Sequence, residues 1–135
     1  MILSGKLIAK LIKNGKIKIG PNPEIKEASV KIHFGGRFGE TRETLSVVDN
    51  YILEPKHFVL AESREDVALP ENLAGLYDTY VGLARQGITT HMGSMLVDPG
   101  FCGKIQLEIF NCSDVAVELK EGMRAGHLMI VEVLT

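Results

Sequence analysis

Apolar and polar residues alternate along much of this chain, and a period of two predicts β-strands rather than helices. The clearest run is KIQLEI at 104–109. Three apolar residues take one face of this strand, and three polar residues, ending with Glu108, take the other. The turn sequence Asp98-Pro99-Gly100 precedes the run, and polar breaks follow it. We therefore predict a β-meander over residues 93–133.

A short helix is expected at the N-terminus. Ser4 is a suitable N-cap residue, and Gly15 suits the position just after the last turn. Between them, apolar residues recur at the helical spacing 7, 8, 11 and 12, with lysines on the other side. Such a helix either lies on a membrane surface or packs on the domain. We favour packing, because so short an apolar stripe anchors weakly to a bilayer.

The remaining strands are shorter. They are expected at 16–19, 28–34, 58–61 and 67–69, with two more inside 41–53 and a turn or bulge at Gly35-Gly36. The segment 72–88 fits either one helix or a strand at 76–78 followed by a short helix at 83–86. Many short strands and one helix predict a mostly β domain, either a sandwich or a distorted barrel.

Composition narrows the class of protein. The 135 residues are expected to form one domain, 1–135, with 45% hydrophobic residues. Fifteen basic residues against seventeen acidic ones argue against a nucleic-acid partner. No apolar run is long enough to span a membrane and lysines interrupt any signal-peptide core, so we expect no membrane partner and cytoplasmic residence. Cys102 and Cys112 form no CxxC pair, and we expect free, buried thiols.

Several catalytic and metal-binding patterns are missing from the sequence. The four histidines share no metal-ligand spacing, so we assign no metal-binding residue. The H-x-E and P-C-x-x-C signature of zinc-dependent base deaminases is absent, which argues against zinc as a cofactor. The P-loop pattern of nucleotide triphosphatases is absent too.

Three charged residues are candidates for chemistry, and each has a plainer interpretation. Glu108 is a solvated strand carboxylate or, where a subunit contact covers its face, a desolvated acid suited to proton transfer. Arg85 is a surface cation or a fork for phosphate. Asp98 most simply caps its own turn. None of the three defines a function alone.

Four segments together resemble the dCTP deaminase branch of the dUTPase superfamily. They are HFVLAESREDVALPENLAG at 57–75, GLARQG at 82–87, VDPGFCGKIQLEIFN at 97–111 and EGMRAGHL at 121–128. The opening MILS and the run ASVKIHFGGRF at 28–38 are similar to that family's N-terminal helix and first motif. The resemblance implies a distorted β-barrel of the β-clip type with a short N-terminal helix. It also implies a homotrimer whose nucleotide sites are shared between neighbouring subunits.

The resemblance also implies roles for individual residues. Glu108 would be the catalytic residue, which positions a water and moves protons while ammonia leaves carbon 4 of the cytosine of dCTP. Arg85 would contact the triphosphate together with Mg²⁺, which binds through the nucleotide phosphates. Asp98 would contact the sugar or base, and the main chain around Leu107 would contact the base. The implied substrate-binding residues are Leu83, Ala84, Arg85, Asp98 and Leu107.

The chain departs from the family pattern at several positions. Where the second motif has arginine and two serines, this sequence has Tyr80-Val81-Gly82, and Lys31 stands where the first motif has aspartate. The glycine-glutamine pair near the last strand is Gly126-His127. Three hypotheses follow: a dCTP deaminase that forms dUTP, a catalytically impaired nucleotide-binding or structural trimer, and a dUTP pyrophosphatase. The last is least favoured, because the aspartate expected to activate water is Lys31.

Overall fold

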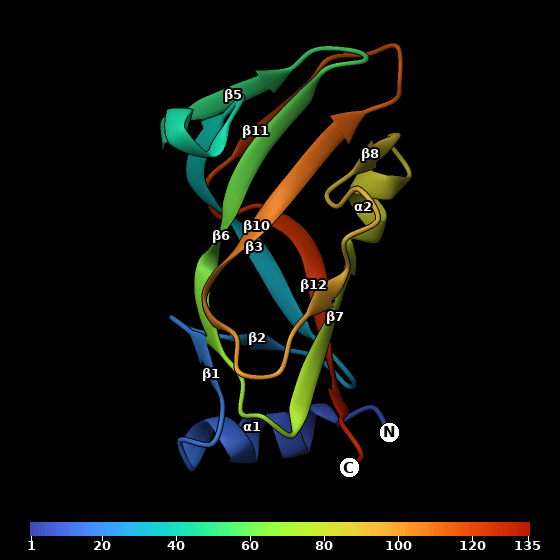
Figure 1. The fold of residues 1–135 in the computed structure, drawn as a ribbon. Helices are drawn as coiled ribbons and strands as arrows, with labels where there is room; N and C mark the ends of the chain where they lie inside the picture. The colour runs from blue at the N-terminus through green and yellow to red at the C-terminus, as the bar shows by residue number, and fades with distance from the viewer.

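The computed structural model describes all 135 residues and is mostly β (Figure 1). Two helices, α1 (Gly5–Lys13) and α2 (Val81–Ala84), and one 3-10 turn, η1 (Arg42–Thr44), accompany the strands. The strands are β1 (Lys18–Gly20), β2 (Glu24–Ile25), β3 (Val30–Gly39), β4 (Ser46–Val47), β5 (Asn50–Leu53), β6 (Phe58–Ala68), β7 (Leu73–Thr79), β8 (Ile88–Thr89), β9 (Leu96–Val97), β10 (Cys102–Asn111), β11 (Val117–Lys120) and β12 (Arg124–Glu132).

The strands form one large, curled sheet and one small one. The large sheet runs β8-β10-β6-β3-β12-β7-β9, with β1 paired to β6 and both β2 and β4 paired to β3. In the small sheet β5 pairs with β11. Both sheets contribute to one core of 25 buried apolar residues. Figure 1 shows α1 and both chain termini at one end of the molecule and β5, β8 and α2 at the other. The prediction of a mostly β, distorted barrel with an N-terminal helix is confirmed.

The N-terminal helix forms where its capping residues predicted it. The Ser4 hydroxyl accepts a hydrogen bond of 3.2 Å from the N–H of Leu7. Gly15 follows the last turn with φ +73°, a left-handed conformation that glycine adopts without steric cost. Ile8 is fully buried. The helix therefore packs its apolar side on the domain.

The predicted meander is wrong, although its strands exist. β10 pairs with β6 and with β8, β11 pairs with β5, and β12 lies between β3 and β7. None of these three strands pairs with the next one in the sequence. The alternation of side chains fixes which face of a strand is apolar, but it carries no information about the hydrogen-bonding partner.

The two strands predicted at 58–61 and 67–69 are one continuous strand, β6. Burial alternates along its whole length, because Ser63 and Glu65 point inward at the same period as the apolar residues around them. The prediction missed this continuity because the inward positions in the middle of the strand are polar. These polar residues make buried hydrogen bonds.

Other local predictions are partly correct. At Gly35-Gly36 the chain forms a bulge within β3 rather than a turn, since the register against β6 shifts between Phe34 and Phe38. For 72–88 the structure takes the strand-then-helix alternative, as β7 and α2. Cys102 and Cys112 are free but exposed, not buried. No helix is long and apolar enough to cross a membrane.

Candidate active site

Glu108 lies near the end of β10, on the face that points away from the core. The flanking residues Leu107 and Ile109 are fully buried, which confirms the alternation predicted for 104–109. The Glu108 side chain is half-buried, and its Oε1 accepts a hydrogen bond of 3.1 Å from the N–H of Met92. No ion pair reaches it within the single chain. The carboxylate is thus oriented by main chain rather than by a cation.

Thr90 anchors the segment that holds this carboxylate. Its carbonyl oxygen accepts the N–H of Glu108 at 3.1 Å, and its own N–H donates to the hydroxyl of Thr79 at 2.9 Å. The fully buried Thr90 hydroxyl lies 2.8 Å from the Tyr77 hydroxyl and 3.2 Å from the carbonyl oxygen of Ala125. The position of the Glu108 backbone is therefore tied to the core between β7 and β12.

An aspartate–histidine pair lies beside this anchor. His91 Nε2 is 3.0 Å from Asp78 Oδ1, which also accepts the N–H of Thr79 at 2.7 Å. The hydrogen bond to His91 and then the one from Thr79 hold the pKa of Asp78 below its usual value of 3.8. The pair fixes residue 91, immediately before the Met92 N–H that contacts Glu108. Sequence reasoning missed it, because Asp78 and His91 are thirteen residues apart and share no motif spacing.

The free edge of β10 presents main-chain groups next to Glu108. β10 pairs with β6 along one edge, but on the other edge β8 covers only Phe110 and Asn111. Main-chain groups of successive strand residues point to opposite edges. Since the Glu108 N–H points to Thr90, the groups of Leu107 point to β6 and those of Gln106 point to the open edge. Within this chain, Gln106 rather than Leu107 offers main-chain groups to a ligand.

The Leu83-Ala84-Arg85 segment forms the end of α2. Leu83 is buried in the core, so its side chain is structural. Ala84 lines a cavity of about 320 Å³ together with Asp78 and Thr89. Arg85 is exposed and its guanidinium makes no hydrogen bond or ion pair, which leaves it available to an anion.

Asp98 is not brought near Glu108 within one chain. Its carbonyl oxygen accepts the N–H of Phe101 in the turn before β10, next to the β6–β7 connection at Pro70. Between that turn and Glu108 lie six residues of β10, about 20 Å at the rise of an extended strand. The predicted site residues therefore form two separate groups in the single chain.

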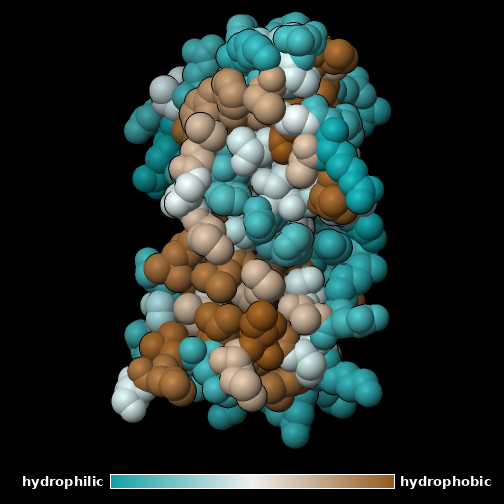
Figure 2. All heavy atoms as spheres, turned by 90° about the vertical axis from the view of Figure 1, so that its right-hand side faces the viewer, coloured by the Kyte–Doolittle hydropathy of each residue, from teal (hydrophilic) through white to brown (hydrophobic).

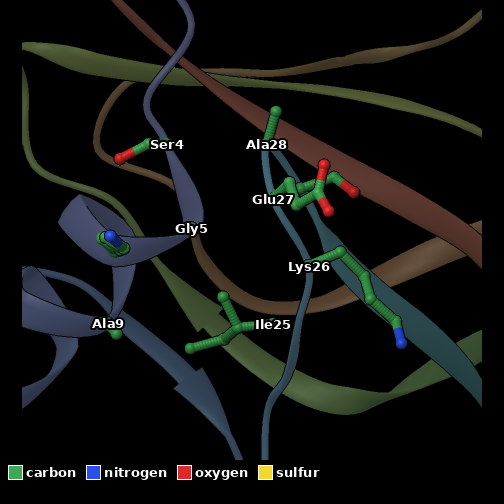
Figure 3. A pocket seen from close by; sticks show the side chains of 9 residues that line it. Ser4, Gly5, Ala9, Ile25, Lys26, Glu27 and Ala28 are labelled. Atoms are coloured by element: carbon green, nitrogen blue, oxygen red, sulfur yellow. The ribbon is translucent and has the colours of Figure 1, made fainter.

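The largest cavity is unrelated to these residues. It measures about 890 Å³ and lies between the start of α1 and residues 25–29, with Ser4 and Lys26 at its sides (Figure 3). The chain approaches itself closely there, since a Cβ on Gly5 would lie 1.8 Å from the carbonyl oxygen of Lys26. None of the predicted site residues lines this cavity. The volume of a cavity therefore does not identify the candidate site in this protein.

A buried charge network lies behind β3 and escaped the sequence analysis. Glu65 is fully buried, and its two oxygens contact His33 at the main-chain N–H (2.9 Å) and at Nδ1 (2.6 Å). His33 Nε2 lies 2.9 Å from Glu24 Oε1, and Glu24 also binds the guanidinium of Arg124. The period-two placement of Glu65 among the apolar residues of β6 was the available signal.

The side chains of this protein do not form a set of metal-binding donors by themselves. No group of three or more histidine, cysteine, aspartate or glutamate side chains is positioned to hold an ion. Mg²⁺ is commonly held through substrate phosphates and its own waters rather than by such a cage.

A family model described as dCTP deaminase-like matches residues 2–133. The chain belongs to the dCTP deaminase-like family. Among relatives of this family, the dCTP deaminase of Thermomicrobium roseum is 32% identical over 92% of this chain and 76% of its own length. A dUMP-forming dCTP deaminase of Dictyoglomus thermophilum is 33% identical over 92% of this chain and 76% of its own length.

Solved structures show the same fold at lower identity. The 2'-deoxycytidine 5'-triphosphate deaminase of Agrobacterium tumefaciens superposes with a TM-score of 0.78 at 18% identity, covering 96% of this chain and 46% of that chain. This dCTP deaminase-like chain thus spans just under half of the Agrobacterium chain. The dUTPase of EIAV superposes with a TM-score of 0.63 at 18% identity, over 86% of this chain and 88% of that one. The fold is dUTPase-like, as the resemblance implied.

Proposed function

We propose that this protein hydrolyses the amino group of the cytosine of dCTP, with Glu108 as general acid and base. The observation that carries the proposal is the Glu108 carboxylate, which the Met92 N–H orients at an open strand edge. Relatives named dCTP deaminases, about one third identical, support the substrate. The Gln106 main-chain groups beside Glu108 are free to recognise the edge of a pyrimidine.

The chemistry requires one water and one proton carrier. Glu108 accepts a proton from water as the oxygen bonds to carbon 4 of cytosine. It then returns a proton so that the C4–N bond breaks and ammonia leaves. The net change is dCTP plus water to dUTP plus ammonia. A single carboxylate suffices because it acts first as base and then as acid.

Arg85 is the proposed contact for the triphosphate, because its exposed guanidinium has no protein partner. Mg²⁺ would enter already bound to the phosphate oxygens, and the protein need supply no cage for it. Asp98 would reach the sugar or base of a nucleotide held by a neighbouring subunit. A separation of about 20 Å from Glu108 within one chain favours this arrangement over a site inside one subunit.

A homotrimer completes the proposal. Figure 2 shows hydrophobic residues gathered on the lower half of the face that presents β7, β9 and β12. Large apolar side chains exposed in this region include Ile2, Met95 and Leu96. Exposed apolar surface of this kind marks an association site. Sedimentation at micromolar concentration should give about 44 kDa, three times the 14.8 kDa chain, and a 14.8 kDa species would contradict the trimer.

Two other functions remain as alternatives, and one of them has a specific observation in its favour. The sequence Tyr80-Val81-Gly82 lacks the arginine and hydroxyl groups of the related motif, which favours a trimer that binds nucleotide without turnover. A dUTP pyrophosphatase is the third candidate. Lys31 stands against it, because a lysine at that position cannot activate water as a carboxylate does.

One assay separates the three functions. Purified protein is incubated with dCTP or dUTP and Mg²⁺, and ammonia and pyrophosphate are followed separately. Deamination predicts ammonia from dCTP, lost in Glu108→Gln, while pyrophosphate reveals whether the product is dUTP or dUMP. Nucleotide binding in calorimetry without either product would support the impaired trimer. Pyrophosphate released from dUTP by Glu108→Gln would support the pyrophosphatase.

A further inference from the structure

A small cavity lined in part by β10, the strand of Glu108, gathers three cationic side chains. It measures about 190 Å³ and lies between β3, η1, β6 and β10. Three of its lining side chains are cationic and one is anionic. The lining residues are Arg37, Arg42, Leu45, Glu62, Lys104 and Gln106. The whole chain has a net charge of −2, so this excess of cations is local rather than general.

The cations differ in how they are held. Arg37 contacts Glu62 at 2.9 Å and the carbonyl oxygen of Leu45 at 3.2 Å, which directs its guanidinium along the cavity wall. Lys104 Nζ donates to the carbonyl oxygen of Arg64 at 3.1 Å and lies 3.5 Å from Asp66. Arg42 is exposed and its guanidinium has no protein partner. One of the three cations that line the cavity is therefore without a protein partner.

The ion pairs Arg37–Glu62 and Lys104–Asp66 still allow an anion to bind in the cavity. Arg37 and Lys104 keep 48% and 39% of their side-chain surface exposed. Ion pairs at such exposure contribute little net stability, because solvent screens them and both long side chains lose entropy. A multiply charged anion can therefore recruit these cations without disrupting the fold.

The cavity adjoins the candidate catalytic residue. Gln106 lines the cavity, and Gln106 and Glu108 occupy the same face of β10, about 7 Å apart along the strand. Across the sheet, Gln106 pairs with Glu62 of β6, and Glu62 contacts Arg37 of β3. A ligand that places its base at the open edge of β10 has this cationic cavity within the length of a nucleotide.

We propose that the cavity formed by Arg37, Arg42 and Lys104 binds the phosphate chain of the nucleotide. This assignment rests on the proposed function for the identity of the nucleotide, but the phosphate chemistry does not depend on turnover. It gives the chain a second set of cations besides Arg85. Tyr80-Val81-Gly82, which replaces the arginine and serines of the second motif, lies on a different element, α2 and its N-cap.

Calorimetry with three ligands tests the proposal on the full chain. The ligands are inorganic tripolyphosphate, dCTP and deoxycytidine, and the variants are Arg42→Ala, Arg42→Lys and Lys104→Gln. Loss of one charge-assisted phosphate contact should weaken tripolyphosphate and dCTP about tenfold and leave deoxycytidine unchanged. Arg42→Lys should recover part of the loss. Lys10→Ala, an exposed lysine on α1, is the control and should change nothing.

The outcomes separate this proposal from the proposed function. Tripolyphosphate and dCTP affinities that respond to Arg42→Ala support the cavity even where no ammonia is released. Unchanged affinities in Arg42→Ala and Lys104→Gln overturn it, and so does the absence of tripolyphosphate binding. If Arg85→Ala alone weakens dCTP while deamination persists, the deaminase stands and the cavity does not. If the variants weaken the binding of tripolyphosphate but not that of dCTP, the cavity does not bind the phosphates of the nucleotide and the proposal is overturned.

Discussion

Lys31 and Tyr80 meet in this structure, with the Lys31 Nζ 5.4 Å from the centre of the Tyr80 ring. The Arg124 guanidinium lies 5.7 Å from the same ring. Lys31 and Tyr80 are two of the positions at which the chain departs from the related sequences. The resemblance implies an aspartate and an arginine at these two positions, and this chain instead packs Lys31 against the Tyr80 ring. The two positions are therefore in contact in this chain, and we predict that substitutions at them are energetically coupled.

A double-mutant cycle tests this coupling. Tyr80→Arg alone should destabilise the protein, because it adds a third cation beside Lys31 and Arg124. Lys31→Asp alone should lose a cation–π contact of about 0.5–1 kcal/mol. The double variant should be more stable than the sum of the two changes by about 1 kcal/mol, measured by urea denaturation. Additive effects within about 0.3 kcal/mol would show that the two positions are independent.

Acid should weaken the contact between Glu24 and Arg124. Chiefly through the hydrogen bond from Arg124, the pKa of Glu24 falls from 4.5 to about 2. A carboxylate whose pKa is lower in the folded state than in the unfolded state stabilises the fold fully at a pH above its unfolded-state pKa. This stabilisation is lost as the pH falls towards the folded-state pKa. The difference in unfolding free energy between the unaltered protein and Glu24→Gln should therefore shrink between pH 4.5 and 2. A free-energy difference that stays constant between pH 4.5 and 2 would contradict a stabilising contact between Glu24 and Arg124.

Removing the buried carboxylate of Glu65 should be costly. Glu65→Ala leaves the His33 main-chain N–H without an acceptor and the His33 ring without its buried partner. The expected loss is about 3 kcal/mol in the free energy of unfolding. Glu118→Ala, an exposed residue paired with Lys120, is the matched control and should cost less than about 1 kcal/mol. Equal losses in the two variants would refute a structural role for the buried charge.

Gly126 should tolerate no side chain. A Cβ there would lie 2.3 Å from the carbonyl oxygen of Asp78 and 2.4 Å from the Tyr77 hydroxyl. Gly126→Ala should therefore lower the free energy of unfolding by about 1–3 kcal/mol, since backbone must move. Gly20→Ala is the control, because a Cβ at Gly20 meets nothing within 4 Å. A thermal melt of Gly126→Ala that matches that of the control would show that the strands separate easily.

Local signals were enough to predict the elements that depend on neighbouring residues. The α1 helix follows from Ser4, Gly15 and the spacing between them, and the apolar face of β10 follows from strict alternation. The pairing of strands could not be predicted in this way. Leu107 pairs with Ala61, forty-six residues earlier, and nothing in either local pattern identifies the other. A period of two gives the face of a strand but not its neighbour.

The candidate site shows the same division. The resemblance implies that Glu108 is the catalytic residue, and in the structure its side chain is half-buried and oriented by the Met92 N–H. The Asp78–His91 pair and the Glu65–His33 contact depend on β7 and the 90s segment, or β3 and β6, coming together in space. Ser63 and Glu65 are polar residues at inward positions of β6, between the two short strands that the sequence predicts. Such residues mark buried hydrogen bonding, here to His33 and within β6.

The hydrogen bonds of Thr90 have an evolutionary consequence. Because this residue fastens the backbone of Glu108 to the interior, the position of that backbone does not depend on the side chains of the neighbouring segments 80–82 and 93–96. Substitutions at 80–82 or 93–96 can then retune ligand preference without dislodging the proton carrier. Such an anchor permits the sequence of those two segments to change during evolution while the glutamate stays in place.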